Sequence, residues 1–154
     1  HDYSAEELRD FLKDESLKVF GENCPSFLIT SEMTAKASAG RLRVRIREGA
    51  IFSKYDFNQL LIHEVMTHTL TGLNGSLQPI LKIMGQSAPR TTKTQEGLAT
   101  FSEIITGNMD LHRLKRLALR VIAVEMALEG ANFYELYNFF VSNFSCYFIK
   151  SSIC

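Results

Sequence analysis

The spacing of apolar side chains in the first third of the chain predicts one helix followed by a strand. Leucines and phenylalanines recur at helical spacing after Ser4 and Glu7, which together form a capping box, so we expect a helix over residues 5–20. Residues 27–30 are short, apolar and rich in strand formers, and they predict a strand. Residues 33–40 are small and polar, which favours a loop or a helical turn.

Residues 41–47 alternate strictly between arginine and an aliphatic residue. Leu42, Val44 and Ile46 fall on one side, and four arginines fall on the other. Because successive side chains of a strand point to opposite faces, this period of two predicts a strand with one buried face. The arginine face is either solvated or a basic ledge for an acidic substrate, and the pattern leaves both interpretations open.

The rest of the chain is predicted to be mainly helical. We expect helices over residues 56–72, 77–84, 95–106, 110–129 and 132–144. Ser53 or Asp56 can begin the first of these, and Asn74-Gly75 can end it. Thr94 can begin the helix over 95–106. The apolar residues of 110–129 are expected to be largely buried.

A helix, a few strands and then helices are the element order of an α+β fold with a small sheet. The chain has 154 residues, which fits one domain, so we expect residues 1–154 to form a single domain. No apolar run reaches the roughly 18 residues that a membrane span requires.

Charge and cysteine usage narrow the function classes. The 17 basic and 17 acidic side chains balance, which argues against a nucleic-acid or membrane-surface binder. Cys24, Cys146 and Cys154 are far apart and odd in number, so we expect neither a disulfide framework nor a cysteine-based zinc site. This cysteine usage is typical of a reducing compartment, and we expect a cytoplasmic protein.

The predicted helix over 56–72 carries two histidines and a glutamate on a short apolar segment. His63 and Glu64 are adjacent and His68 follows, which gives the pattern H-E-x-x-x-H. The familiar metallopeptidase pattern, H-E-x-x-H, places its histidines at i and i+4 on one helix face. At roughly 100° per residue, an i, i+5 pair points about 140° apart on a regular helix. Both rings can reach one zinc ion only if the helix widens locally, as in a π-bulge.

These three residues alone leave two interpretations open. A histidine on an apolar face is more often a buried structural residue than a ligand, and that interpretation predicts a regular helix through residues 63–68 and no metal. Two imidazoles and a carboxylate are also what a protein needs to hold zinc and to activate a water molecule.

Zinc in a hydrolase usually takes three protein ligands and leaves the fourth position for water. Glu96 is a candidate third ligand, because it follows the histidine pair and is expected in the first turn of the helix over 95–106. A glutamate in a first turn is more often a surface residue that compensates the helix dipole.

Three motifs in this order resemble a known family. They are His63-Glu64-x-x-x-His68, Asn74-Gly75-x-x-Gln78-Pro79 and Gln95-Glu96-Gly97-Leu98-Ala99. Together they are similar to the bacterial family named after its QEGLA motif, whose members are described as metallopeptidases or as modulators of flavohaemoglobin expression. That family looks related to the eukaryotic microtubule-associated tyrosine carboxypeptidases, which remove the C-terminal tyrosine of tubulin. The resemblance covers about residues 5–141.

The resemblance implies a zincin-like fold in which His63, His68 and Glu96 bind Zn²⁺. It implies that Glu64 is the catalytic carboxylate, which takes a proton from the attacking water and passes it to the leaving amine. Glu103 lies seven residues after Glu96, on the same predicted helix face. It is either a partner for a ligand histidine or a structural acid.

The activity implied is zinc-dependent hydrolysis of a C-terminal peptide bond in a peptide or protein tail, with an acidic tail as one candidate. A carboxypeptidase needs a cation for the terminal carboxylate. Arg43 and Arg45 are candidates because their strand directly precedes the metal helix, and zincin folds commonly align substrate along a strand edge there. Arg90 is a third candidate, and solvated surface charge is the alternative for all three.

A non-catalytic regulatory or binding module that contains zinc is the alternative function. Glu64 favours the enzyme, because a structural zinc site has no need of a base beside it. The segment over residues 144–154 does not resemble the continuation of the family, so we expect a truncated catalytic domain whose own activity is open.

Overall fold

A computed structural model of the chain describes residues 2–143. The chain divides into two compact units, residues 1–109 and residues 110–154. The expectation of a single domain over 1–154 stays a prediction, and the segment over 144–154 lies outside the described residues.

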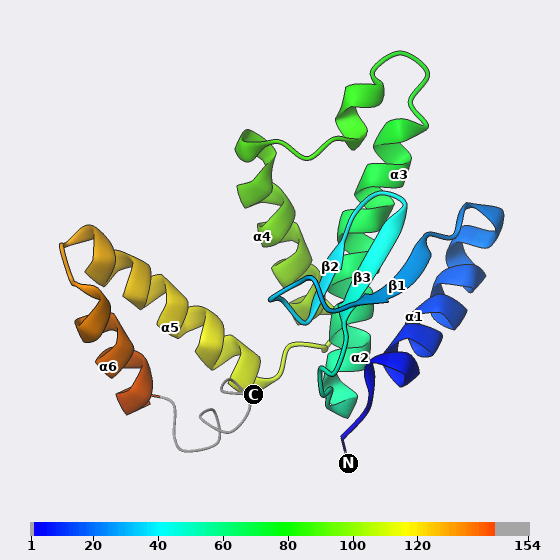
Figure 1. Cartoon of the computed structure of the whole chain (residues 1–154). Helices are drawn as coiled ribbons and strands as arrows, with labels where there is room; N and C mark the ends of the chain where they lie inside the picture. The colour runs from blue at the N-terminus through cyan, green and yellow to red at the C-terminus, as the bar shows by residue number, and fades with distance from the viewer. Residues whose placement is uncertain (1, 144–154) are drawn as a thin grey trace. The chain divides into compact units, whose positions relative to one another are not determined.

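The first unit mixes helices with a small sheet, which confirms the α+β class (Figure 1). Its elements are α1 (Ala5–Phe20), the 3-10 turn η1 (Gly21–Asn23), β1 (Ser26–Thr30), β2 (Ala37–Ala39), β3 (Arg43–Arg47), α2 (Lys54–Leu60), the π-helix η2 (Leu61–Thr69), α3 (Leu70–Ser76), the 3-10 turn η3 (Lys82–Gly85) and α4 (Pro89–Ile105). The described part of the second unit consists of α5 (Leu111–Leu128) and α6 (Phe133–Asn143).

The three strands form one sheet in the order β1-β3-β2, with β1 parallel and β2 antiparallel to β3. The prediction of a loop or helical turn over 33–40 was wrong, because β2 lies within it. Its three small residues carry no apolar alternation that a sequence pattern could detect. They form a strand because β3 offers backbone groups for pairing.

The core of the first unit lies between one face of the sheet and the helices behind it. Val44 and Ile46 of β3 are fully buried, together with Leu8 and Leu12 of α1, as the two periodicities predicted. Leu42 was expected to join them, but 57% of its surface is exposed. It lies in the turn before β3, where the alternation of the strand has not yet begun.

The helices α2, η2 and α3 follow one another without a break and pack against the sheet and α1 (Figure 1). The predicted stop at Asn74-Gly75 was wrong, because α3 continues to Ser76. A Cβ atom at Gly75 would lie 2.2 Å from the backbone nitrogen of Gly85. Gly75 therefore serves the close approach of the η3 turn to α3 and does not end the helix.

The helix predicted over 95–106 begins earlier, at Pro89, which occupies its first turn. Proline is favoured there because the missing N–H has no partner within the helix. Thr94 therefore lies inside α4 and does not cap it. Glu96 also lies in the interior of the helix, so compensation of the helix dipole no longer explains it.

In the second unit, α5 and α6 closely match the predicted ranges. Asp110 caps α5 by accepting the N–H of Arg113 at 2.9 Å. The expectation that the apolar residues of α5 are largely buried was wrong, because only Leu119 and Ala123 of this helix are buried. Among the described residues, no helix combines the length and the apolar character needed to cross a bilayer.

Candidate metal centre

The helix widens where the histidine pair lies, because Leu61–Thr69 is a π-helix. The hydroxyl of Thr67 donates to the carbonyl of Ile62, five residues earlier, at 2.9 Å. The hydroxyl of Thr69 donates to the carbonyl of Gly40 at 3.0 Å and ties the widened segment to the β2–β3 turn. The local widening expected from the histidine spacing is therefore present, and the regular helix of the metal-free interpretation is not.

His63, His68 and Glu96 converge on one point. Each offers one ligand atom, and these atoms lie within 4.8 Å of one another. One carboxylate oxygen of Glu96 lies 3.5 Å from Nε2 of His63, and the other lies 3.6 Å from Nε2 of His68. The two imidazole rings meet edge to face, with centroids 4.9 Å apart. The extra residue in the π-helix has brought both rings to the same side.

This donor set fits a zinc ion. Two imidazoles and one carboxylate are a ligand set found in catalytic zinc sites, and tetrahedral donors at usual zinc distances lie about 3.3–3.5 Å apart. The separations of the two Glu96 oxygens from the two imidazoles are close to that value, and with one donor atom from each residue the three atoms lie within 4.8 Å of one another. His63 is buried and His68 half-buried, whereas 58% of the Glu96 side chain is exposed, so the site opens to solvent on the side of α4.

The other nitrogen of His63 contacts a buried carboxylate. Nδ1 of His63 lies 2.5 Å from Oε1 of Glu103, which is fully buried. The same oxygen accepts the side-chain amide of Gln59 at 3.0 Å. The structure therefore shows the contact with His63 that the first interpretation of Glu103 requires. A hydrogen bond at Nδ1 leaves Nε2 of His63 facing Glu96 and His68.

Glu64 lies beside this cluster and bonds to the sheet. Its Oε2 accepts the backbone N–H of Ala39 in β2 at 2.8 Å. β2 is an edge strand, so it has outward-pointing backbone groups of this kind. The bond fixes one oxygen of the carboxylate.

A cleft of about 420 Å³ contains Glu64 and the three converging side chains. One wall consists of Ala35 and residues 37–41, which include β2. The other walls come from α3, from the segment over 84–87 and from the start of α4.

Of the predicted substrate-binding residues, Arg43, Arg45 and Arg90 do not line this cleft. β3 is the middle strand of the sheet, so its arginines do not lie at the strand edge that was expected to face the metal helix. The edge strand there is β2. Arg41, in the turn that follows β2, is the one lysine or arginine among the described residues that lines the cleft.

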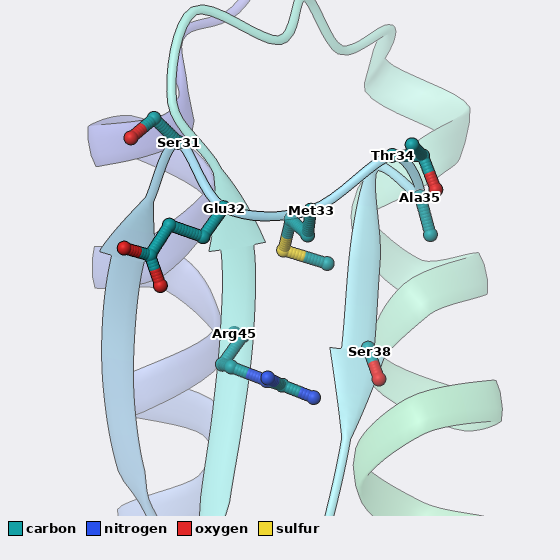
Figure 2. Close-up of a pocket in the computed structure, with 7 residues that line it drawn as sticks. All are labelled: Ser31, Glu32, Met33, Thr34, Ala35, Ser38 and Arg45. Carbon is teal, nitrogen blue, oxygen red and sulfur yellow. The ribbon is translucent and has the colours of Figure 1, made fainter.

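Arg45 instead contributes to a shallow hollow of about 490 Å³ on the exposed face of the sheet. Figure 2 shows its side chain extending across the sheet toward Ser38, its partner in the β2–β3 register. Glu32 and Met33 also line the hollow. Ala35 and Ser38 line both the hollow and the cleft, so the two lie side by side across β2.

Sequence reasoning missed three contributors to the site. A signal existed for Gln59, which lies four residues before His63 and so on the same helix face. No side-chain pattern could reveal Ala39, because its contribution is a backbone N–H. Arg41 belongs to the predicted arginine face, and only the end of β2 determines which arginine turns toward the cleft.

Comparison with known proteins gives one match. A family model described as "Microtubule-associated tyrosine carboxypeptidase" matches residues 1–147. No curated protein and no solved structure matches the chain significantly. The family match confirms the relation to those carboxypeptidases that the three motifs indicated.

Proposed function

This chain belongs to the microtubule-associated tyrosine carboxypeptidase family, and on that premise we propose that it is a zinc-dependent carboxypeptidase with a zincin-like fold. The observation that carries the proposal is the convergence of His63, His68 and Glu96 in a cleft that also contains Glu64. A metal-binding helix that packs against a sheet, with an edge strand along the cleft, supports the zincin-like assignment.

Nε2 of His63, Nε2 of His68 and a carboxylate oxygen of Glu96 are the atoms that would hold the ion. A bound Zn²⁺ supplies Lewis-acid chemistry, which lowers the pKa of a water molecule toward neutrality and polarises a carbonyl group. The exposed side of Glu96 leaves room for water and substrate to reach the site.

Glu64 is the proposed general base. Its Oε2 is bonded to the N–H of Ala39, so Oε1 is the atom that we assign to proton transfer. It would take a proton from the water that attacks the peptide carbonyl and return it to the leaving amine. The bond to Ala39 restricts rotation of the carboxylate, and Glu64 lines the cleft.

The outer edge of β2 is the proposed track for the substrate backbone. The N–H of Gly40 donates to the carbonyl of Arg43, and the carbonyl of Lys36 accepts the N–H of Arg47, so the backbone groups of Lys36 and Gly40 face β3. In an antiparallel pair the bonded positions alternate, so the backbone groups of Ala37 and Ala39 point outward. The N–H of Ala39 is bonded to Glu64, so the proposed track consists of the backbone groups of Ala37 and the carbonyl of Ala39. An extended peptide can add there as a further strand.

Arg41 is the proposed anchor for the terminal carboxylate, because it is the one arginine that lines the cleft. Arg45 lies in the adjacent hollow across β2 and can contact acidic side chains upstream of the cleaved bond. The substrate class we propose is therefore a peptide or protein tail with a free C-terminus, acidic before the last residue. The three widely spaced cysteines fit the reducing cytoplasm, which we propose as the location.

A Glu64→Gln substitution tests the mechanism. The variant should keep the zinc content and thermal stability of the unchanged protein and lose about 10²–10⁴-fold in turnover of an acidic peptide that ends in tyrosine. Elemental analysis and mass spectrometry of the released amino acid measure the two quantities. Cleavage at the unchanged rate would refute Glu64 as the base. Zinc without cleavage in the unchanged protein would instead favour the regulatory or binding module.

The same peptide with an amidated C-terminus tests the anchor. Because the amide removes the negative charge that Arg41 is proposed to bind, this peptide should resist cleavage. Arg41→Ala should raise KM for the free peptide about tenfold or more, with unchanged zinc content. The matched control is Arg90→Ala, which lies outside the cleft and should leave KM unchanged. Equal effects of the two substitutions would remove Arg41 from this role.

A further inference from the structure

Side chains from two helical segments alternate in one continuous chain of contacts. Gln59, His63 and His68 come from α2 and η2, and Glu96 and Glu103 come from α4. The contacts run from the amide of Gln59 to Glu103, from Glu103 to His63, and from there through Glu96 to His68. The last three contacts belong to the candidate metal centre, and the first, from Gln59, extends the chain of contacts into the core.

The spacing of these residues explains why the chain of contacts forms. Gln59 lies in the last turn of α2 and His63 near the start of the π-helix, and a separation of four residues puts them on one helix face. Glu96 and Glu103 are seven residues apart, which is two turns of α4. Each carboxylate of α4 therefore meets a different nitrogen of the His63 ring.

Burial gives the amide of Gln59 a role as a donor to Glu103. Glu103 is fully buried, and a buried carboxylate is costly unless hydrogen-bond donors surround it. Gln59 is itself 6% exposed, at a position where an aliphatic side chain would fill the same space. Its amide and the ring of His63 bond to the same oxygen of Glu103, so a rotation of that carboxylate would break both bonds at once.

We propose that Gln59 is a positioning residue for the metal centre. It holds Oε1 of Glu103 at Nδ1 of His63, and this bond keeps Nε2 of the same ring directed at Glu96 and His68. The part of this inference that concerns metal affinity rests on the proposed function. The part that concerns the order of the His63 ring does not.

Gln59→Met tests the inference, because methionine has the length and unbranched shape of glutamine but no donor. The first readout is the zinc dissociation constant from chelator competition. Loss of a partner that directly contacts a ligand histidine costs about 10–100-fold in metal affinity, and a group one contact farther away should cost less, about 3–10-fold. The second readout uses no metal. It is the exchange rate with water of the His63 Nδ1 proton, followed by NMR on histidine-labelled apoprotein and assigned with a His63 variant. We expect this exchange to accelerate at least several-fold.

Gln78→Met is the matched control. Gln78 is exposed, its side-chain amide donates to the carbonyl of Asn74, and it lies outside the cleft. It should change neither readout. Circular dichroism and thermal unfolding establish that each variant is folded. If Gln59→Met does not fold, Gln59→Leu, which also removes the donor, takes its place.

The two readouts separate the possible failures. If the unchanged protein binds no zinc, the proposed function fails, but faster exchange in Gln59→Met would still establish Gln59 as the residue that orders His63. If the unchanged protein binds zinc and the Gln59 variant matches it in both affinity and proton exchange, the inference is overturned and the proposed function stands. An effect of equal size in Gln78→Met would also overturn the inference.

Discussion

At the scale of single residues, the two ring nitrogens of His63 each contact a different carboxylate. Nε2 faces Glu96 at 3.5 Å and Nδ1 faces Glu103 at 2.5 Å. Both carboxylates come from α4, so the orientation of the ring depends on the packing of α4 against η2. His68 has a different environment, because it is half-buried and faces Glu96 alone among the carboxylates of the described cluster.

The ligand assignment predicts opposite outcomes for two histidine substitutions. His68→Ala should reduce the zinc content from about one ion per chain to almost none, because it removes a proposed ligand. The loss in affinity should exceed the about 10–100-fold expected for a residue that only supports a ligand. Elemental analysis after gel filtration measures the content.

The control is His112→Ala, at an exposed position in α5 outside the histidine cluster. It should retain the zinc content of the unchanged protein. Equal zinc content in the two variants would refute the assignment of His68.

At the scale of the secondary structure elements, the π-helix brings the two histidines of the H-E-x-x-x-H motif to the same side of the helix. On a regular helix the two histidines would diverge by about 140°. The π-helix over Leu61–Thr69 takes up the extra residue, and its inserted turn is supported by hydroxyl bonds from Thr67 and Thr69. A π-bulge is costly in isolation and is frequently found at functional sites.

A second element-scale feature is the close approach of three glycines beside the cleft. Gly72 and Gly75 lie in α3, and Gly85 ends η3. A Cβ atom on Gly85 would meet the carbonyl of Gly72 at 2.6 Å. This contact holds the wall of the cleft that contains Met84 and Gln86.

Gly75→Ala should therefore destabilise the protein and disturb the cleft. The added methyl group would overlap the backbone at Met84 and Gly85. Such overpacking should lower the free energy of unfolding by about 1–3 kcal/mol. Gly97→Ala is the matched control in α4, because a Cβ atom there meets nothing within 4 Å. It should raise the unfolding free energy by about 0.5–1 kcal/mol, since alanine favours a helix interior.

Urea unfolding followed by circular dichroism measures both changes. A Gly75→Ala variant as stable as the Gly97→Ala variant would show that η3 does not pack on α3 as described.

At the scale of the whole molecule, the proposed site belongs to one of the two units. Every member of the main hydrophobic cluster and every side chain of the metal centre lies within residues 1–109. The described helices of the second unit supply none of them.

A chain that ends at Met109 should therefore fold and bind about one zinc ion. It retains the whole core between α1, the sheet and η2, and it retains the two histidines proposed as ligands, Glu96 and Glu103. Circular dichroism and elemental analysis test this expectation, with His68→Ala in the shortened chain as the control for specific binding. An unfolded shortened chain would favour the single domain over residues 1–154 that the length predicts.

The sequence by itself determined the features that depend on local periodicity and residue chemistry. The capping pair of Ser4 and Glu7 and the apolar spacing placed α1, and the alternation of Val44 and Ile46 with arginines placed β3. The H-E-x-x-x-H spacing predicted a widened helix, because the rotation per residue of a regular helix would turn the two histidines apart. That widening is present. These features were predictable because each depends on residues that are close together in the chain.

Only the tertiary structure decided the features that depend on contacts between distant segments. β2 exists because β3 offers it a partner, and its backbone N–H at Ala39 reaches Glu64 across 25 residues of chain. The choice of Arg41 over Arg43 and Arg45 follows from which strand lies at the edge of the sheet. Gln59 and Glu103 are 44 residues apart in the chain, and the packing of the two helices brings them into contact. No sequence periodicity predicts this contact.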